Sequence, residues 1–294
     1  MSLYNFKFII NGNAASGKLA KNLESIISKI KTHFPSADCN ITKNVSELDK
    51  YLTNLEETDT VIAVGGDGTL NAVVNKVVDK NIAVGLLPYG TGNDFAFSAK
   101  LPTDMDEALN FIKKRKVKTI DLGKITTNKY TTYFINTMGI GFDALVAYKT
   151  NNLKFFSGNI KYYLSLITAI FTYKSYRLNI EIESEKINKK CFLITVGNGK
   201  RSGGAFILTP DAIIDDSIFQ LCIVDDISMI KFFTAVPKTL KGLHGKFKFI
   251  KFQNAKQIKI ESDSEICLHF DGETLSKINN ALIEILPNKI KFIC

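Results

Sequence analysis

Three short apolar segments near the N-terminus are each followed by a glycine-containing loop, and this repetition constrains the fold most. The segments are Phe6–Ile10, Val61–Val64 and Ile82–Leu87. A helical pattern from Lys18 to about His33 follows the first loop, and another through Val78 follows the second. Strands that alternate with helices predict a parallel sheet with helices on both faces. Because ligands of such sheets bind beyond the carboxyl ends of the strands, we expect the loops to meet at one ligand-binding edge.

The second half of the chain has a different pattern. After about Asp121 strand-like segments dominate, and only Ser157–Thr172 and Ser228–Leu240 have a helical pattern. The strand-like segments are Tyr133–Asn136, Leu178–Ile182, Phe192–Val196, Ile218–Val224, Ile258–Ile260, Ile266–Phe270 and Leu282–Ile285. Short strands separated by turns favour a β-sandwich. We therefore predict an α/β domain over residues 1–121 and a β-sandwich domain over residues 122–286, a division that suits a chain of 294 residues.

The composition limits the partners of the protein. Its net charge of +9 favours nucleotides, nucleic acid or an anionic membrane, or serves solubility alone, and nothing besides this charge supports nucleic acid. The five cysteines are scattered and the histidines number three, which argues against a disulfide framework or a metal cluster. The apolar stretch Tyr162–Tyr173 is shorter than the about 20 residues of a spanning helix, and no signal-peptide pattern is present. We therefore expect a cytoplasmic protein that meets membranes from their surface.

The strongest local motif is Gly65-Gly66-Asp67-Gly68-Thr69, between the second apolar segment and its helix. Adjacent glycines let the backbone come close to a ligand. Backbone N–H groups at the start of a helix bind anions, and the Thr69 hydroxyl can cap that helix. Asp67 would lie beside the bound anion, where it can hold Mg²⁺ or a bridging water. The motif therefore predicts a phosphate site, and the alternative is a tight strand-to-helix turn.

Two other loops carry similar residues. Gly90-Thr91-Gly92-Asn93-Asp94 combines small residues with a hydroxyl and a carboxylate, although glycine and asparagine are also ordinary loop residues. The segment 12–18 has the GxxxxGK spacing of a Walker A loop, but Leu19 stands where that loop needs Ser or Thr for Mg²⁺. We therefore expect a nucleotide contact at the first loop without the mechanism of a P-loop enzyme.

Acidic residues of the second domain are further candidates. Asp271-Gly272-Glu273 lies between apolar segments and is typical of a hairpin turn, or Glu273 is a general base, a role worth about 10²–10⁴ in rate. The basic, glycine-rich segment 197–204 could face a phosphate or a lipid headgroup. Asp215 and Asp216 could hold a hard cation together with backbone carbonyls, or form a solvated turn.

Taken in order, these motifs resemble the soluble diacylglycerol kinase-like lipid kinases, bacterial members especially, with sphingosine and ceramide kinases as relatives. Gly65–Thr69 is identical to the GGDGT motif of that family, and Asn13–Gly17 resembles its Asn-Pro-x-Ser-Gly loop. The other matching segments are Leu87–Phe95, Asn136–Asp143, Gly203-Gly204, Pro210–Ala212 and Asp271–Glu273. The resemblance extends over nearly the whole chain.

The resemblance implies an ATP-dependent kinase with a Rossmann-like N-terminal domain, a C-terminal β-sandwich and ATP in the cleft between them. It also implies that segment 287–294 returns to the first domain. The implied nucleotide contacts are Asn13, Ser16, Gly17, Thr42, Gly66, Asp67, Gly68, Thr69, Asn71 and Thr91. The implied Mg²⁺ ligands are Asp67, Asp94 and Asp121 at a catalytic ion, and Ile213, Asp216 and Ile218 at a structural ion. The implied catalytic residues are Glu273 as the base, Asp67 and Asp271.

Two positions depart from the pattern of the family. Ala14 replaces the usual proline, which should loosen the first loop. Ser217 replaces the usual glycine after Asp216, which would weaken the structural metal site if that position needs a positive φ.

A lipid acceptor has to be reached at a bilayer surface, and the segment from Lys231 to Lys251 is a candidate for that contact. Its lysines are Lys231, Lys238, Lys241, Lys246, Lys248 and Lys251, interleaved with Phe232, Phe233, Phe247, Phe249 and Phe252. Near an anionic leaflet each lysine could contribute about 1 kcal/mol. The alternative is an amphipathic helix and strand with buried phenylalanines and solvated lysines.

Several functions stay open at this stage. Diacylglycerol is the leading acceptor, giving phosphatidic acid, but phosphatidylglycerol, a sphingoid base or a polyprenol also presents a hydroxyl at the interface. NAD kinase, which acts on a soluble substrate, shares the GGDGT motif, and a non-catalytic nucleotide-binding regulator is a third alternative. We expect a cytoplasmic protein that lies transiently at the inner face of the cell membrane, and a homodimer is compatible with each function.

Overall fold

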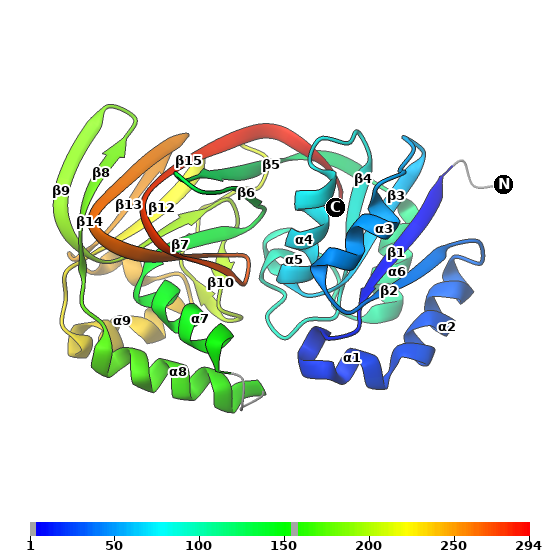
Figure 1. The fold of residues 1–294 in the computed structure, drawn as a ribbon, viewed down its shortest axis with the longest axis horizontal. Coiled ribbons are helices and arrows are strands. Elements are labelled where there is room, and N and C mark those ends of the chain that lie inside the picture. The colour runs from blue at the N-terminus through cyan, green and yellow to red at the C-terminus, as the bar shows by residue number, and fades with distance from the viewer. Residues whose placement is uncertain (1–3, 154–157) are drawn as a thin grey trace.

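The computed structural model describes residues 4–153 and 158–294, without the side chains of residues 15, 16, 18 and 158–163. Within these residues 13 strands form one continuous sheet that runs through both halves of the molecule (Figure 1). Its strand order is β13-β12-β9-β7-β14-β15-β4-β3-β1-β2, with β5, β6 and β8 paired beside this path. The sheet is parallel at the N-terminal half and antiparallel at the other.

The N-terminal half has three layers, as the sequence predicts. Its parallel strands are β1 (Asn5–Asn11), β2 (Asp38–Thr42), β3 (Asp59–Gly65) and β4 (Ala83–Pro88). One face packs against α2 (Leu23–His33) and α6 (Met105–Lys114). The other packs against α3 (Leu48–Leu52), α4 (Asp67–Val77) and α5 (Asp94–Ser98). Every residue of β3 and β4 is buried, because both of their faces are covered.

The long helix expected from Lys18 to His33 is two helices. A 3₁₀ turn, η1 (Ala14–Gly17), precedes α1 (Lys18–Lys21), and α2 begins only at Leu23. Asn22 separates them with φ −109° and ψ 13°, and its side chain bonds to the Tyr89 hydroxyl. Asparagine favours such breaks because its side chain competes for local hydrogen bonds. Further along, η2 (Val45–Glu47) leads into α3.

The C-terminal half is a β-sandwich, as predicted, with three helices at its lower edge (Figure 1). Its strands are β5 (Val117–Thr126), β6 (Thr131–Phe134), β7 (Thr137–Gly141), β8 (Tyr176–Ile182), β9 (Glu185–Gly197), β10 (Arg201–Ser202), β11 (Phe206–Ile207), β12 (Phe219–Asp225), β13 (Ile250–Ala255), β14 (Gln257–Phe270) and β15 (Glu273–Ile293). The helices are α7 (Phe142–Asn152), α8 (Gly158–Thr172) and α9 (Met229–Thr239), and a turn, η3 (His244–Lys246), follows α9.

Several predicted elements differ from the observed ones. The two segments expected at 258–260 and 266–270 are one strand, β14, with irregular register between Glu261 and Ile266. The strand expected over 133–136 ends at Phe134. Helix α7 was not expected, because its buried residues Phe142, Ala144 and Val146 alternate as in a strand. Helices α8 and α9 were expected, although Ser157, the predicted start of α8, lies outside the described residues.

Strand β15 joins the two halves. It pairs with β14 in the sandwich and with β5 along most of its length, and near its end it pairs in parallel with β4, where Lys291 lies opposite Ala83. The chain thus returns to the first half, where buried Phe292 packs edge-on against Phe95 at a ring separation of 5.1 Å. The predicted domain limits at 121 and 286 fall inside β5 and β15 rather than in loops. No helix of the described residues is long and apolar enough to cross a membrane.

The anchoring of β15 in the first half gives a stability prediction. Phe292→Ala removes a fully buried aromatic ring and should lower the free energy of unfolding by about 3–5 kcal/mol, measured by chemical denaturation. Tyr130→Ala, at a side chain that is half exposed, should change it by no more than about 0.5 kcal/mol. A loss below about 1 kcal/mol for Phe292→Ala would contradict the packing described for this strand.

Candidate active site

The three glycine-containing loops meet at the carboxyl edge of the parallel strands, as expected. The loops after β3 and β4 touch so closely that a Cβ atom on Gly90 would lie 2.4 Å from the Cα atom of Gly66. The first loop joins them through Asn11, whose amide donates to the Thr69 hydroxyl at 2.9 Å. Asn13 in turn donates to the carbonyl of Lys43 at 2.7 Å. Backbone and short polar side chains therefore surround the beginning of α4.

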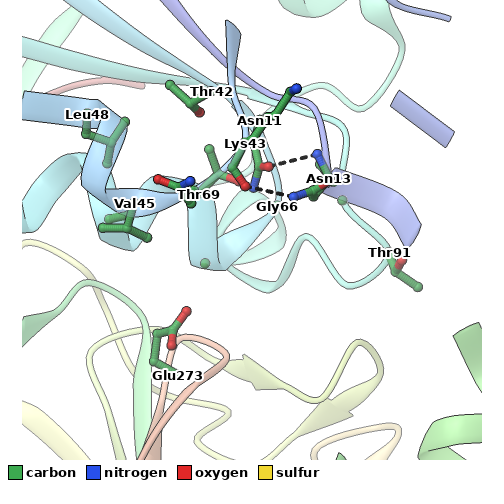
Figure 2. A pocket seen from close by; sticks show the side chains of 15 residues that line it. Asn11, Asn13, Thr42, Lys43, Val45, Leu48, Gly66, Thr69, Thr91 and Glu273 are labelled. Carbon is green, nitrogen blue, oxygen red and sulfur yellow. Dashed lines mark hydrogen bonds between the residues drawn. The ribbon is translucent and has the colours of Figure 1, made fainter. Parts of the chain in front are cut away.

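A cavity of about 340 Å³ opens at this edge (Figure 2). It is lined by Asn11, Asn13, Ala14, Thr42, Lys43, Asn44, Val45, Leu48, Gly66, Gly68, Thr69, Ala72, Gly90, Thr91 and Glu273. Six of these are predicted nucleotide contacts: Asn13, Thr42, Gly66, Gly68, Thr69 and Thr91. Gly17, Asp67 and Asn71 lie outside the lining, and the Ser16 side chain lies outside the described residues. Their contacts with a nucleotide stay predictions.

Sequence reasoning missed the part of the cavity that follows β2. Lys43, Asn44 and Val45 come directly after this strand, and Leu48 begins α3. The strand itself was not predicted, because Asp38–Thr42 is short and mixes polar with apolar residues, as edge strands do. The signal that could have located it is Asn44, which caps the following turn by accepting from the Glu47 N–H.

Glu273 enters the cavity from the sandwich half. It is the first residue of β15 and is exposed, and within the described residues its side chain has no hydrogen bond or ion pair. One of its carboxylate oxygens would lie 3.8 Å from a Cβ atom on Gly68, in the first turn of α4. Figure 2 shows the side chain reaching across from the hairpin toward the loops of the first half.

The segment before Glu273 is a hairpin turn, which was one of the two interpretations of this segment. Asp271 and Gly272 have φ values of +46° and +93°, and Phe270 pairs with Glu273 across the turn. Positive φ at both central residues is the geometry of a tight two-residue hairpin and explains the Asp-Gly pair. The turn places Glu273 at the hairpin tip, and its role as a general base stays a prediction.

Asp271 itself is buried and fully engaged. Its carboxylate accepts hydrogen bonds from the backbone N–H groups of Ile135, Asn136 and Thr137, at 2.6, 3.1 and 3.0 Å. It also accepts one from the Asn71 amide on α4 at 3.0 Å. Burial raises the pKa of Asp271 to about 6, although hydrogen bonds from Ile135, Thr137 and Asn71 act in the opposite direction and lower it. These bonds give Asp271 and Asn71 positioning functions, and the catalytic role of Asp271 stays a prediction.

Helix α7 holds the hairpin from its other side. At its first turn, Asp143 lies 3.0 Å from Nε2 of His269, which is on β14 two residues before Asp271. At its last turn, the Asn151 amide donates to the Gly272 carbonyl and the Thr274 hydroxyl. Glu273 thus projects from a turn that is held by α4 on one side and by α7 on the other.

Asp67 and Asp94 form a pair of neighbouring carboxylates. Asp67 accepts from the backbone N–H groups of Asp94 and Phe95, at 3.0 and 2.8 Å, and so caps the short helix α5. Burial raises the pKa of the Asp94 carboxyl, and the negative charge of Asp67 raises it further. A Cβ atom on Gly92 would lie 3.4 Å from one carboxylate and 3.5 Å from the other. Two like charges held this close create a position that favours a cation.

Arg201 of the basic loop forms an ion pair with Asp94. Its Nε donates to Asp94 at 2.7 Å, and its Nη2 donates to the carbonyls of Gly92 and Asn93. The Gly204 N–H also donates to Asp94. Arg201 thus joins the sandwich half to the Gly90–Asp94 loop, and a contact of the basic loop with a phosphate or a headgroup stays a prediction.

The three aspartates predicted to hold the catalytic ion, Asp67, Asp94 and Asp121, do not form one cluster. Among the described residues no group of three acidic, histidine or cysteine side chains is arranged to hold a metal ion. Asp121 is fully buried and accepts from the Ser217 and Asn288 N–H groups rather than joining Asp67 and Asp94. Ser217 does have a positive φ, +63°, next to the exposed Asp216. The structural magnesium site of Ile213, Asp216 and Ile218 stays a prediction.

A Rossmann-like half whose glycine-containing loops are faced by a carboxylate from a β-sandwich half is the arrangement expected of a two-domain nucleotide-dependent phosphotransferase. Family comparison agrees: residues 5–125 match the diacylglycerol kinase catalytic domain, and residues 136–294 match the YegS C-terminal NAD kinase beta sandwich-like domain. The chain belongs to the family of bacterial diacylglycerol kinases and is a kinase.

Individual relatives resemble most of the chain. A diacylglycerol kinase of Staphylococcus saprophyticus is 29% identical over 95% of this chain and 95% of its own length. One of Staphylococcus aureus strain JH9 is 32% identical over 76% of this chain and 70% of its own. A solved structure from Bacillus anthracis str. Sterne, provisionally described as a diacylglycerol kinase, has a TM-score of 0.76 at 27% identity, over 98% of this chain and 96% of its own.

The His269–Asp143 pair gives a pH prediction. Burial lowers the pKa of His269, but Asp143, with smaller contributions from Asp271 and Asp94, raises it above the ordinary value of 6.5. The pair therefore stabilises the fold fully below about pH 6.5, and this contribution is lost as the pH rises through the raised pKa. The loss of unfolding free energy caused by His269→Gln should be largest at low pH and shrink toward pH 9.

The measurement is chemical denaturation of wild type and variant across that pH range. Asp143→Asn removes the same partner charge and should reproduce the same trend. A difference between wild type and His269→Gln that stays constant with pH would show that the two side chains are not an ion pair.

Proposed function

We propose that this kinase transfers the γ-phosphate of ATP to the hydroxyl of diacylglycerol, giving phosphatidic acid, and that it does so at the inner face of the cell membrane. The observation that carries this proposal is the position of Glu273, which lines the cavity, lies close to the first turn of α4 and has no ion pair among the described residues. The names of the relatives support the acceptor.

The cavity has a polar and an apolar end that suit the two ends of ATP. Gly66, Gly68 and Thr69 lie at the start of α4, where backbone N–H groups and the helix dipole favour the triphosphate. Val45, Leu48 and Ala72 offer apolar surface to the base. Thr91 and Asn13 would then lie beside the phosphates.

Asp67 and Asp94 fit a magnesium ion. Mg²⁺ is usually held by one or two carboxylates together with substrate phosphates rather than by a cage of protein ligands, so two neighbouring acids next to a phosphate site are sufficient. The ion would neutralise charge on the transferred phosphoryl group. Arg201 would keep Asp94 ionised and oriented. Asp121 would contribute through the loop that it holds rather than as a ligand of this ion.

Glu273 is the base in this proposal. Its carboxylate takes the proton of the acceptor hydroxyl while that oxygen bonds to the γ-phosphorus. The bond from phosphorus to the bridging oxygen breaks, and ADP leaves with the electron pair. Positioning supplies most of the rate in such transfers, so the hold of α4 and α7 on the hairpin matters as much as the carboxylate.

Glu273→Gln keeps the size of the side chain and removes the base. With diacylglycerol in mixed micelles, ATP and Mg²⁺, the variant should lose about two decades or more of kcat, measured as transfer of labelled γ-phosphate, while ATP affinity is little changed. Glu265→Gln, at an exposed position on β14, is the matched control and should keep full activity. Equal rates for wild type and Glu273→Gln would remove Glu273 from the mechanism.

A panel of acceptors separates the remaining functions. Phosphatidylglycerol, a sphingoid base and a polyprenol test other lipid kinases, and NAD tests a kinase with a soluble substrate. Labelling of one of these instead of diacylglycerol would replace the acceptor in the proposal. Tight ATP binding without transfer to any of them would favour a nucleotide-binding regulator.

A further inference from the structure

We propose that the outward sides of α8 and α9 form a docking face for an anionic bilayer. The docking face consists of Ile167, Phe171, Ile230, Phe233, Leu240 and Leu243. This inference rests on the proposed function, because a kinase that phosphorylates a membrane lipid has to reach the bilayer, and it specifies the surface that does so.

Helix α9 has two apolar sides, although a helix at the surface of a protein needs only one. Its inward side includes Ala235, which is buried, and Phe232, whose ring lies 4.9 Å from that of Phe142 and 5.0 Å from that of Phe192. On the opposite side Ile230 is 79% exposed and Phe233 46% exposed. These two residues are three positions apart, and the exposed Pro237 and Leu240 continue the same stripe.

Helix α8 extends this apolar surface. Ala169 is fully buried in the hydrophobic cluster that also contains Ala235 of α9, so the two helices pack into one core. Outward, Ile167 is 51% exposed and Phe171, one turn further on, is 84% exposed. Figure 1 shows α8 and α9 together along the lower edge of the sandwich half. The docking face contains six of the twelve exposed large apolar side chains of the described residues, so these side chains are concentrated here.

Basic residues border the apolar stripe. Lys231, Lys238 and Lys241 are exposed on or just after α9, and none of them has an ion pair within the described residues. Lys174 is exposed just after α8. Neither helix contains an acidic residue, and the nearest acid before α9 is Asp226. Exposed apolar side chains bordered by lysines are typical of helices that lie in the interface of an anionic bilayer.

The structure corrects the surface expected from the sequence. Phe232, Phe247, Phe249 and Phe252 pack against the cluster beneath α8 and α9 rather than pointing outward. Among the five phenylalanines of that segment, Phe233 is the exposed one. Besides Phe233, the apolar part of the docking face is therefore supplied by residues other than these phenylalanines, including Ile167 and Phe171 of α8, which lie outside the segment from Lys231 to Lys251.

The docking face is connected to the proposed active site through a single helix. Helix α7 packs on α8, and at its end Asn151 bonds to the carbonyl of Gly272, the residue before Glu273. A bilayer bound at α8 and α9 would therefore lie next to the half of the molecule that supplies the base. This placement suits an acceptor that is drawn from the bilayer.

Sedimentation with vesicles tests the docking face. Wild type should bind vesicles of phosphatidylglycerol and phosphatidylcholine, and added salt should weaken the binding. Ile230→Ser/Phe233→Ser should reduce the partition coefficient at least about tenfold, because both apolar side chains are lost. Lys231→Glu/Lys238→Glu should reduce it at least about fivefold per lysine. Two controls should bind as wild type: Tyr130→Ser, at a side chain elsewhere that is about as exposed as Phe233, and Lys113→Glu/Lys114→Glu, exposed on α6.

Two acceptors distinguish this inference from the proposed function. Ile230→Ser/Phe233→Ser should phosphorylate long-chain diacylglycerol in vesicles at least about tenfold more slowly than wild type. It should phosphorylate a short-chain diacylglycerol, dispersed as monomers, at the wild-type rate, which also shows that the variant is folded. If wild type phosphorylates neither acceptor, the proposed function is wrong. The vesicle-binding measurements then still test the docking face, because they do not depend on kinase activity.

Three results would overturn the docking face. One is unchanged vesicle binding by both double variants in α9. Another is binding that does not depend on phosphatidylglycerol. The third is a wild-type dimer that becomes a monomer on Ile230→Ser/Phe233→Ser in sedimentation velocity without vesicles, which would assign the surface to a second copy of the chain.

Discussion

The Asp271 carboxylate accepts four hydrogen bonds, three from the backbone N–H groups of residues 135–137 at the start of β7 and one from Asn71 on α4. Bonds to an ionised group contribute about 1.5–3 kcal/mol each, and their loss would leave buried donors without partners. The same residue forms the hairpin turn that carries Glu273. One buried side chain therefore links α4 of the first half to the hairpin of the second half that carries Glu273, the proposed base.

The rest of the site is built around this junction. Strand β15 begins at Glu273 and ends beside β4, so the chain that carries the proposed base is also part of the sheet that carries the phosphate loops. Arg201 forms a second junction by bonding Asp94 from the sandwich half. Because these connections join the two halves directly, the geometry of the cavity depends on how both halves pack together. Asp67 and Asp271 both accept hydrogen bonds from backbone N–H groups of other segments, and Asp271 also accepts one from Asn71.

The sequence was sufficient for the fold class and for the loops around α4, because glycine patterns and short apolar strands report local backbone geometry directly. It was not sufficient to predict elements and contacts that depend on residues far away in the chain. The buried residues of α7 alternate as in a strand, and only its packing on the sandwich makes it a helix. The bonds of Asn71 to Asp271 and of Arg201 to Asp94 join residues 200 and 107 positions apart, which no local pattern encodes. The exposed stripe of α9 also appears only once the opposite side is known to be buried.

In the proposed function the triphosphate lies between the first turn of α4 and Glu273. A crystal structure with a non-hydrolysable ATP analogue and Mg²⁺ would show where the phosphates bind. We expect phosphate oxygens against the backbone N–H groups of 66–69, a metal ion beside Asp67 and Asp94, and the γ-phosphate on the side of the cavity that Glu273 faces. A nucleotide whose phosphates follow the first loop toward Lys18, or whose γ-phosphate points away from Glu273, would contradict this expectation.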